Sequence, residues 1–359
     1  GDVAAQHNFI DFAAYVAMFP QLIAGPIVRY RDIAPQLKER THSLEAAASG
    51  ASRFAVGLGK KVLLANNIGA LWDIYAAAPE LSFAGAWLGA LAFSLQLYFD
   101  FSGYSLMALG AAELLGLQLT TNFDTPYFSR SIREFWGRWH ISFSSWLKDY
   151  VYIPLGGNRK GKARKYLNLL LTFLVSGVWH GVGLTYLIWG ALHGVYQIAG
   201  DATDRLRGRV YAALHVSRTG RLACAWQCLC TFALVNAAWV FFRAASVHDA
   251  LYVLTAQFRN VSLTGLLADI RAIAASFNAK SLLSAAFLAF VLLALAGGVL
   301  LDCARRFKAP GGDLSARMLS LPLIFRWLLY YALAAFIFAG FLMNNGYFAT
   351  AANFLYNNF

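Results

Sequence analysis

Long apolar stretches separated by short charged ones set the pattern of this chain. Apolar runs of about 20 residues, the length that spans a bilayer as a helix, cover residues 166–183, 184–200, 222–243, 281–301 and 320–343. Residues 82–119 contain no lysine or arginine and are long enough for a helical hairpin or for one long tilted helix. The pattern predicts an all-α, polytopic transmembrane protein, with one integral-membrane domain over residues 1–359.

Two other apolar stretches depart from a plain spanning helix. Residues 8–28 are interrupted by Pro20 and Pro26, and proline at that density predicts a broken or re-entrant helix. Residues 50–76 are moderately apolar but carry Lys60 and Lys61. We therefore expect them to form a helix that dips into the membrane without crossing it.

Charged residues are scarce and unevenly placed. Only 13% of the 359 residues are charged, yet the net charge is +12, whereas a soluble domain carries about 25% charge. The loops at residues 129–165, 201–221 and 303–319 are basic, and residues 244–279 are balanced. Two predicted spans separate each basic loop from the next, so all three should face the cytoplasm. Topology therefore explains the basic charge and disfavours nucleic-acid binding.

The candidate chemistry lies in residues 122–181, which hold two histidines that each follow a tryptophan, His140 and His180. If residues 131–148 form one helix, one face carries Trp136, Trp139, Phe143 and Trp146, and another carries Arg133, Gly137, His140, Ser144 and Lys148. We expect such a helix to lie at the membrane interface or to line the mouth of a cavity. Taken alone, His140 could be an ordinary surface histidine of that helix.

His180 ends a polar stripe on the apolar run 166–183. Asn168, Thr172, Ser176 and His180 are spaced by four and share one helix face. Small polar groups such as Thr172 and Ser176 commonly bond neighbouring membrane helices. A buried histidine should be neutral, and a neutral imidazole can accept a proton, so His180 is a candidate general base. A histidine that only packs between helices is an equal alternative.

Asp100 stands inside the apolar stretch L-Y-F-D-F-S-G-Y-S. An ionisable group there faces a cavity or a partner, unless the segment turns at the interface and the carboxylate is solvated. The sequence leaves both open. The turn P-L-G-G-N-R-K-G at residues 154–161 is equally ambiguous, because its cations could bind phosphates or simply mark a cytoplasmic loop. The four cysteines show no metal-ligand spacing.

The run N-F-x-x-P-Y-x-S-x-S-I-R-E-F-W-x-R-W-H-I-S, followed by W-L-x-D-Y-x-Y-I-P-L-G-G-N-R and by W-H-G, resembles the membrane-bound O-acyltransferase (MBOAT) family. Within it, the chain is similar to the bacterial branch of alginate O-acetyltransferase membrane subunits, whose relatives acetylate cellulose, peptidoglycan and other exopolysaccharides. F-P-Q-L-I-A-G-P-I at residues 19–27 and L-Y-F-D-F-S-G-Y-S at residues 97–105 fit the same branch. The family normally has several membrane helices before the first of these segments, so we expect an N-terminally incomplete version.

The resemblance implies a helical fold with re-entrant or interfacial helices around a central membrane tunnel, and it makes residues 122–181 the active-site segment. It implies that His180 is the principal catalytic residue and His140 its partner. The expected supporting residues are Trp179, Asn168, Ser176, Asp100 and Arg133. No bound cofactor and no metal are expected.

The implied reaction transfers acetyl from a cytoplasmic donor, expected to be acetyl-CoA, across the membrane for O-acetylation of an exported polysaccharide such as alginate or cellulose. A base activates the acceptor hydroxyl, and a second group stabilises the oxyanion. Arg159, Lys160 and Lys162 would attract the donor's phosphates. Expected partners are membrane lipid and periplasmic acetyl-acceptor proteins, without nucleic acid. The expected location is the bacterial inner membrane, as a multi-pass protein.

Other functions fit the same architecture. The acceptor could be a teichoic acid that receives D-alanine from a carrier protein, or it could be a lipid or a protein. A non-catalytic transporter or scaffold is a third alternative, because paired membrane histidines and Asp100 could couple protons.

Overall fold

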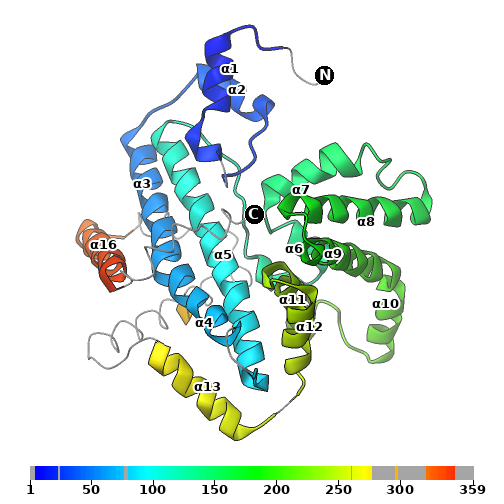
Figure 1. Cartoon of the computed structure of the whole chain (residues 1–359). Coiled ribbons are helices and arrows are strands. Elements are labelled where there is room, and N and C mark those ends of the chain that lie inside the picture. Colours follow the sequence, from blue (N-terminus) through cyan, green and yellow to red (C-terminus); the bar gives the residue numbers. More distant parts are fainter. Residues whose placement is uncertain are drawn as a thin grey trace.

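The computed structural model describes residues 5–22, 25–76, 80–259, 261–276, 296–297 and 321–343. These residues form helices, turns and one isolated antiparallel bridge, between Phe123 and Trp139 (Figure 1). The described part of the chain is therefore consistent with the predicted all-α class.

The helices fall into three groups along the chain. The first comprises α1 (Phe9–Val16), α2 (Tyr30–Lys38), α3 (Leu44–Gly59), α4 (Asn66–Ala76) and α5 (Phe83–Leu114). The second comprises α6 (Ile132–Trp136), α7 (Ile141–Leu147), α8 (Gly161–His180), α9 (Leu184–Ala202), α10 (Asp204–Ala213), α11 (Arg221–Arg243) and α12 (Val247–Ala256). The third comprises α13 (Leu263–Ser276) and α16 (Leu323–Met343). Short 3₁₀ turns lie at Phe19–Gln21 and Pro126–Phe128, and π-helical turns at Lys60–Ala65 and Lys148–Tyr152.

The 32-residue helix α5 settles the choice left open for residues 82–119, because it is one long helix rather than a hairpin. It lies beside α3 (Figure 1), and glycines allow the close approach. A Cβ on Gly50 would lie 2.6 Å from the carbonyl oxygen of Gly110, and a Cβ on Gly57 2.5 Å from that of Gly103. Both contacts would clash, so a side chain at either position would push the two helices apart.

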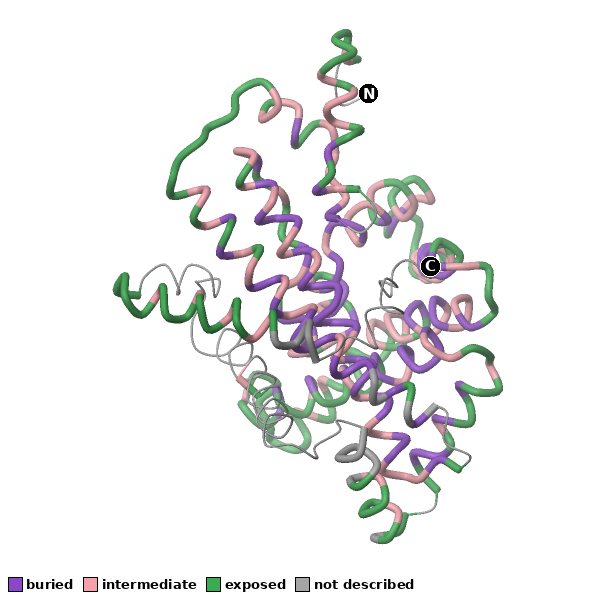
Figure 2. The backbone as a smooth tube through the Cα atoms, turned by 60° about the vertical axis from the view of Figure 1, so that its left-hand side comes forward, coloured by how far each residue is buried: buried purple, intermediate pink, exposed green. Residues whose placement is uncertain are grey.

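Helices α8 and α9 pack in the same way in the other half of the molecule. A Cβ on Gly190 would lie 2.3 Å from the carbonyl oxygen of Phe173, and one on Gly177 2.5 Å from that of Tyr186. The predicted polar stripe of α8 is buried, while Leu167, Val175 and Trp179 on other faces are exposed. Large aromatic side chains fill the junction of α5, α6, α8, α9 and α11. Figure 2 shows the buried positions of the described residues in purple.

One helix within the described residues, α11, is long and apolar enough to cross a membrane, and α16 contributes a shorter apolar stretch, Leu323–Phe338. The predicted spans 166–183 and 184–200 do form helices, α8 and α9. Charged and polar residues lower the mean hydropathy of these helices; in α8, Lys162, Arg164 and Lys165 lie near its start. The predicted span 281–301 and basic loop 303–319 lie outside the described residues.

Residues 8–28 and 50–76, which the sequence distinguishes from plain spanning helices, also contain helices. Helix α1 ends at Val16, and a 3₁₀ turn containing Pro20 follows, which agrees with the predicted break in residues 8–28. Residues 50–76 are helical throughout, from α3 through a π-helical turn into α4. The side chains from Val62 to Ala65 in this turn are buried.

Candidate active site

His140 lies at a break between α6 and α7. Two backbone bonds pair distant segments there: the Asp124 N–H donates to the Arg138 carbonyl (2.9 Å) and the Ile141 N–H to the Asn122 carbonyl (3.0 Å). His140 itself adopts φ +45°, in the left-handed region that side chains other than glycine rarely enter. The prediction of one helix over residues 131–148 is therefore wrong, because this long-range pairing interrupts it. The expected polar face is also wrong at His140, which is 4% exposed and lies with the aromatic residues.

Asn122 holds the His140 side chain. Its Oδ1 accepts three hydrogen bonds: from the Ser142 backbone N–H (3.1 Å), the Ser142 hydroxyl (2.9 Å) and His140 Nδ1 (3.2 Å). A backbone N–H can only donate, which identifies the amide atom at the centre as the oxygen. An amide oxygen can only accept, so the His140 Nδ1 carries a hydrogen. In a neutral imidazole with hydrogen on Nδ1, the lone pair is on Nε2.

The surroundings keep His140 neutral. Burial lowers the pKa of His140 well below its ordinary value, and the nearby His180 lowers it further. The ring stacks on Phe143 at a centroid distance of 4.9 Å and meets the edge of Phe101 at 4.7 Å. His140 is therefore a fixed proton acceptor at Nε2.

Three segments that are distant in the sequence meet at Asn122. The Ile27 N–H donates to the Ser142 hydroxyl (3.0 Å), and Asn122 Nδ2 donates to the Ser105 hydroxyl (3.4 Å). Ile27 ends F-P-Q-L-I-A-G-P-I, and Ser105 ends L-Y-F-D-F-S-G-Y-S. Asn122 is fully buried and was not among the predicted site residues. The sequence feature that could have identified Asn122 is its position as the first residue of the N-F-x-x-P-Y run.

His180 is the last residue of α8 and is 7% exposed. Three aromatic rings meet it nearly at right angles: Trp189 at 5.1 Å, Phe242 at 5.0 Å and Trp179 at 4.8 Å between centroids. Steric crowding explains why a glycine follows His180 in W-H-G. A Cβ on Gly181 would lie 2.7 Å from the Tyr186 ring, so a larger residue would displace that ring and the end of α8.

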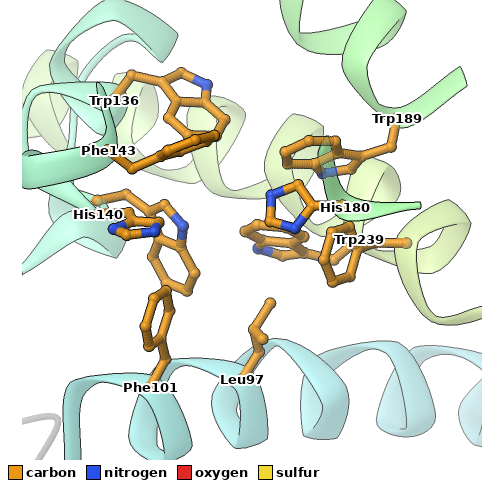
Figure 3. A pocket seen from close by; sticks show the side chains of 10 residues that line it. Leu97, Phe101, Trp136, His140, Phe143, His180, Trp189 and Trp239 are labelled. Atoms are coloured by element: carbon orange, nitrogen blue, oxygen red, sulfur yellow. The ribbon is translucent and has the colours of Figure 1, made fainter. Parts of the chain in front are cut away.

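The two histidines line one cavity (Figure 3). The volume of this cavity is about 20 Å³. Its walls are Leu97, Phe101, Trp136, Trp139, His140, Phe143, His180, Trp189, Trp239 and Phe242. The Phe143 ring contacts both imidazoles, with centroid distances of 4.9 Å to His140 and 6.0 Å to His180. A cavity of this size holds about one water molecule. The arrangement thus joins two imidazoles across a small, mainly aromatic chamber.

A third histidine supports one wall of this chamber. The indole N–H of Trp136 donates to His193 Nδ1 (3.2 Å), and His193 is fully buried beneath the chamber. Because an indole nitrogen only donates, His193 Nδ1 accepts and its hydrogen must be on Nε2. That atom has no hydrogen-bond partner among the described residues. His193 therefore holds Trp136 in place.

Comparison with known proteins identifies the family of this chain. The profile of the membrane-bound O-acyltransferase family (MBOAT) matches residues 3–247. The chain belongs to this family. This match agrees with the family resemblance that the W-H-I-S and W-H-G motifs carry.

Curated relatives of this MBOAT chain are bacterial acyltransferases. A probable alginate O-acetylase, AlgI, of Pseudomonas aeruginosa is 47% identical over 258 residues, 72% of this chain and 48% of the relative. A peptidoglycan O-acetyltransferase of Helicobacter pylori is 44% identical over 251 residues, covering 69% and 46%. A teichoic acid D-alanyltransferase of Streptococcus thermophilus is 30% identical over 207 residues, covering 54% and 50%. The chain spans about half the length of the curated relatives it matches.

Among the predicted supporting residues, Trp179 packs its ring against a catalytic candidate. Its ring packs on Phe143 at 4.5 Å and on His180 at 4.8 Å, but it is 48% exposed and lies outside the cavity wall. Asn168 instead binds the turn before α8: its amide donates to the Gly157 carbonyl (2.8 Å) and accepts from Arg164 (3.0 Å). Ser176 is buried in the α8 stripe and also lies outside the cavity wall.

Asp100 has a charged partner rather than a place in the MBOAT cavity. It is 4% exposed, and its carboxylate lies 2.5 Å from Lys61 Nζ. The alternative of a solvated carboxylate in an interfacial turn is therefore wrong, because residue 100 is in the middle of α5 and Lys61 arrives from the π-helical turn beside it. The neighbouring Lys60 lies 5.5 Å from the Tyr98 ring. The ion pair joins the π-helical turn to α5.

The predicted cations lie away from the MBOAT cavity. Arg133 points outward, its side chain 70% exposed, and pairs with Asp201 (3.3 Å). Arg159, Lys160 and Lys162 are exposed at the start of α8, whereas His180 is at its end. From Lys162 to His180 the helix rises by about 27 Å, close to the thickness of a bilayer's hydrocarbon core. These cations cannot touch a group that reacts at His180. A donor whose phosphates lie at the cations would have to extend over that distance to bring its acyl group to His180.

Proposed function

We propose that this chain forms part of a multi-pass inner-membrane enzyme that transfers acetyl from cytoplasmic acetyl-CoA across the membrane, for O-acetylation of an exported polysaccharide such as alginate or cellulose. The observation that carries the proposal is the shared cavity of His140 and His180. The names of the alginate and peptidoglycan O-acetylating relatives support acetyl as the transferred group.

The proposed reaction is an acyl transfer from sulfur to oxygen. The acceptor hydroxyl gives its proton to a histidine, and its oxygen attacks the thioester carbonyl. The tetrahedral intermediate collapses, the C–S bond breaks and the thiolate of coenzyme A takes the proton back. An ester and free coenzyme A result. A thioester is larger than one water molecule, so the aromatic walls must move apart when substrates bind.

The family resemblance leaves open which histidine is the base, and the hydrogen bonds of His140 favour one division of roles. Its Nδ1–H is used by Asn122, so a neutral His140 can accept a proton at Nε2 but cannot donate from it. We therefore assign the general-base role to His140. His180, the residue to which the family resemblance gives the principal role, would then donate a hydrogen bond to the developing oxyanion. Each role is worth about 10²- to 10³-fold or more in rate.

The proposed donor enters from the side of α8 that carries Arg159, Lys160 and Lys162. Cations there would attract the phosphates of coenzyme A from solution and would not touch the reacting carbonyl. On the opposite side the acetyl group would pass to a polysaccharide or to a periplasmic acceptor protein.

Amide-for-imidazole substitutions test the function and the division of roles together. The assay measures labelled acetyl transfer from acetyl-CoA to a membrane-associated acceptor, by the full-length protein with its partners, and thermal unfolding checks that each variant folds. His140→Ala and His180→Ala should both lose transfer. His180→Asn keeps an N–H donor and should retain about tenfold more activity than His180→Ala. His140→Asn has no basic nitrogen and should be as inactive as His140→Ala.

Four outcomes would contradict the proposal in different ways. Normal transfer by folded His180→Ala removes His180 from the reaction. Recovery by His140→Asn but not by His180→Asn reverses the assigned roles. If wild type fails with acetyl-CoA but transfers D-alanine from a carrier protein, the teichoic acid alternative holds, to which the 30% identical relative points. If wild type transfers neither group, a transporter or scaffold becomes the better explanation.

A further inference from the structure

Trp189 lies beside His180 in the wall of the cavity. It belongs to α9 and is fully buried. Its ring meets the imidazole of His180 at 90°, with 5.1 Å between the ring centroids. In the view of Figure 3 the indole nitrogen is on the side of the Trp189 ring that faces His180. The two side chains therefore form one part of the cavity wall.

The indole N–H of Trp189 is buried and has no hydrogen-bond partner among the described residues. Other tryptophans of the wall direct their N–H groups elsewhere. Trp136 donates to His193 (3.2 Å), and the N–H of Trp239 faces the Tyr127 hydroxyl. Neither of these two partners is a wall residue. An indole nitrogen can only donate, so the N–H of Trp189 is available to an acceptor that enters the cavity.

This unpaired donor is costly to the fold and firmly held. A buried donor without a partner lowers stability by about 1–3 kcal/mol. The Trp189 ring stacks on Trp239, with 5.6 Å between centroids and 20° between planes, and it meets Phe242 at 5.1 Å. The direction of the N–H is thus set before any substrate binds. Donors that are already fixed and desolvated stabilise a developing charge without reorganisation.

We propose that the N–H of Trp189 is a second hydrogen-bond donor to the oxyanion of the acyl-transfer intermediate, beside His180. The inference rests on the proposed function, because the oxyanion forms only if the cavity carries out acyl transfer. Attack of the acceptor hydroxyl on the thioester turns the carbonyl oxygen into the oxyanion of a tetrahedral intermediate. Both N–H groups donate to this oxygen and keep their protons. When the C–S bond breaks, the carbonyl forms again and the thiolate leaves.

The spacing of the two rings allows one oxygen to accept from both donors. An N–H donor lies about 3 Å from its acceptor, so two donors of one oxygen lie at most about 6 Å apart. The ring centroids of His180 and Trp189 are 5.1 Å apart. Figure 3 shows His140 on the other side of the cavity. A base would then act on the acceptor hydroxyl from one side, while the two donors meet the carbonyl oxygen from the other.

The test replaces Trp189 by 3-benzothienylalanine, an analogue of similar shape in which sulfur takes the place of the N–H. Acetyl transfer by the full-length protein with its partners is measured together with thermal unfolding. The kcat should fall by about 10²- to 10³-fold, with an unchanged KM for acetyl-CoA, because the bond is made only in the transition state. The melting temperature should not fall, because no hydrogen bond of the free protein is lost. The limbs of the pH–rate profile should stay in place, because both histidines remain.

The same replacement at Trp87 is the matched control. The N–H of Trp87 donates to the Gln257 carbonyl (3.0 Å), and Trp87 is not a wall residue of the cavity. This variant should show the opposite pattern: its melting temperature should fall, because a hydrogen bond is lost, and its kcat per folded molecule should stay that of wild type.

The outcomes separate this inference from the proposed function. If wild type transfers acetyl and the folded Trp189 variant has an unchanged kcat, the N–H has no part in the reaction and only this inference fails. A raised KM at unchanged kcat would also overturn it, because the N–H would then bind the substrate and the transition state equally. If wild type transfers no acyl group from any thioester donor, the proposed function fails and the inference fails with it.

Discussion

The two histidines of the cavity are held in place by different kinds of contact. His140 is bound through Asn122 and Ser142, in a network that also includes Ile27 and Ser105. The contacts described above for His180 are the edges and faces of aromatic rings. A hydrogen bond selects which nitrogen carries the proton, whereas aromatic packing positions a ring without selecting a tautomer. The difference suggests that the His140 side controls proton affinity and the His180 side controls position.

Asn122→Ala should have the largest effect, because it removes the acceptor that fixes His140. The Nδ1 hydrogen, the Ser142 N–H and the Ser142 hydroxyl would all lose their partner. If His140 is the base, transfer should fall by about 10²- to 10⁴-fold, and the melting temperature should drop, because each buried unpaired donor costs about 1–3 kcal/mol. Acetyl transfer per folded molecule and thermal unfolding measure the two effects.

Asn168→Ala is the matched control for that variant. Asn168 is equally buried and its amide makes two hydrogen bonds, but these hold the turn before α8. It should lose stability and keep its transfer rate per folded molecule. Equal loss of transfer in both variants would mean that Asn122 supports the fold without any specific role toward His140.

On the His180 side, Phe242→Ala should act mainly through stability. Phe242 is 4% exposed and meets His180, Trp189 and Trp239, so truncation should cost about 3–5 kcal/mol in the free energy of unfolding. Phe242→Leu should recover most of that cost and most of the transfer. Full loss of transfer by a stable Phe242→Leu variant would show that the aromatic ring itself is needed by the reaction.

The pH dependence of transfer by Asn122→Asp should distinguish the His140 side of the cavity from the His180 side. A carboxylate beside His140 keeps the three accepted bonds and raises the pKa of the imidazole, because it stabilises the charged form. Transfer requires neutral His140, so the acid limb of the pH–rate profile should move to higher pH, by about one to three units. The loss of activity on acidification should therefore begin at a higher pH than in wild type. Asn168→Asp introduces the same charge away from the cavity and should leave the limb in place; a shift there would point to a general electrostatic effect.

Much of this arrangement could be predicted from local pattern. The period-four stripe of α8 correctly placed Asn168, Thr172, Ser176 and His180 on one buried face, and the apolar run 222–243 is α11 almost to the residue. Both predictions needed only the periodicity of a single helix. The family motifs also identified the two histidines that line the cavity, which periodicity alone could not have paired.

What local pattern missed depends on contacts between distant segments. The aromatic spacing over residues 131–148 is helical, but pairing of residues 122–124 with 138–141 breaks the helix at His140. Asp100 could not be assigned a partner because Lys61 comes from another helix. Asn122 was not predicted as a site residue, since its three accepted hydrogen bonds form only when those segments pair. In each case the deciding contact joins residues from different segments, and the periodicity of one helix cannot predict such a contact.

The smallest effect is expected at Trp179, the exposed neighbour of His180. A phenylalanine there would keep a ring against Phe143 and His180, and because about half of Trp179 is already exposed, Trp179→Phe should cost less than about 1.5 kcal/mol of stability. Transfer should stay within about threefold of wild type, which the same assay and unfolding measurement would show. A tenfold loss of transfer at unchanged stability would contradict this. It would mean that the indole meets a substrate on the open side of His180, and the aromatic contacts of that histidine would then serve the reaction as well as its position.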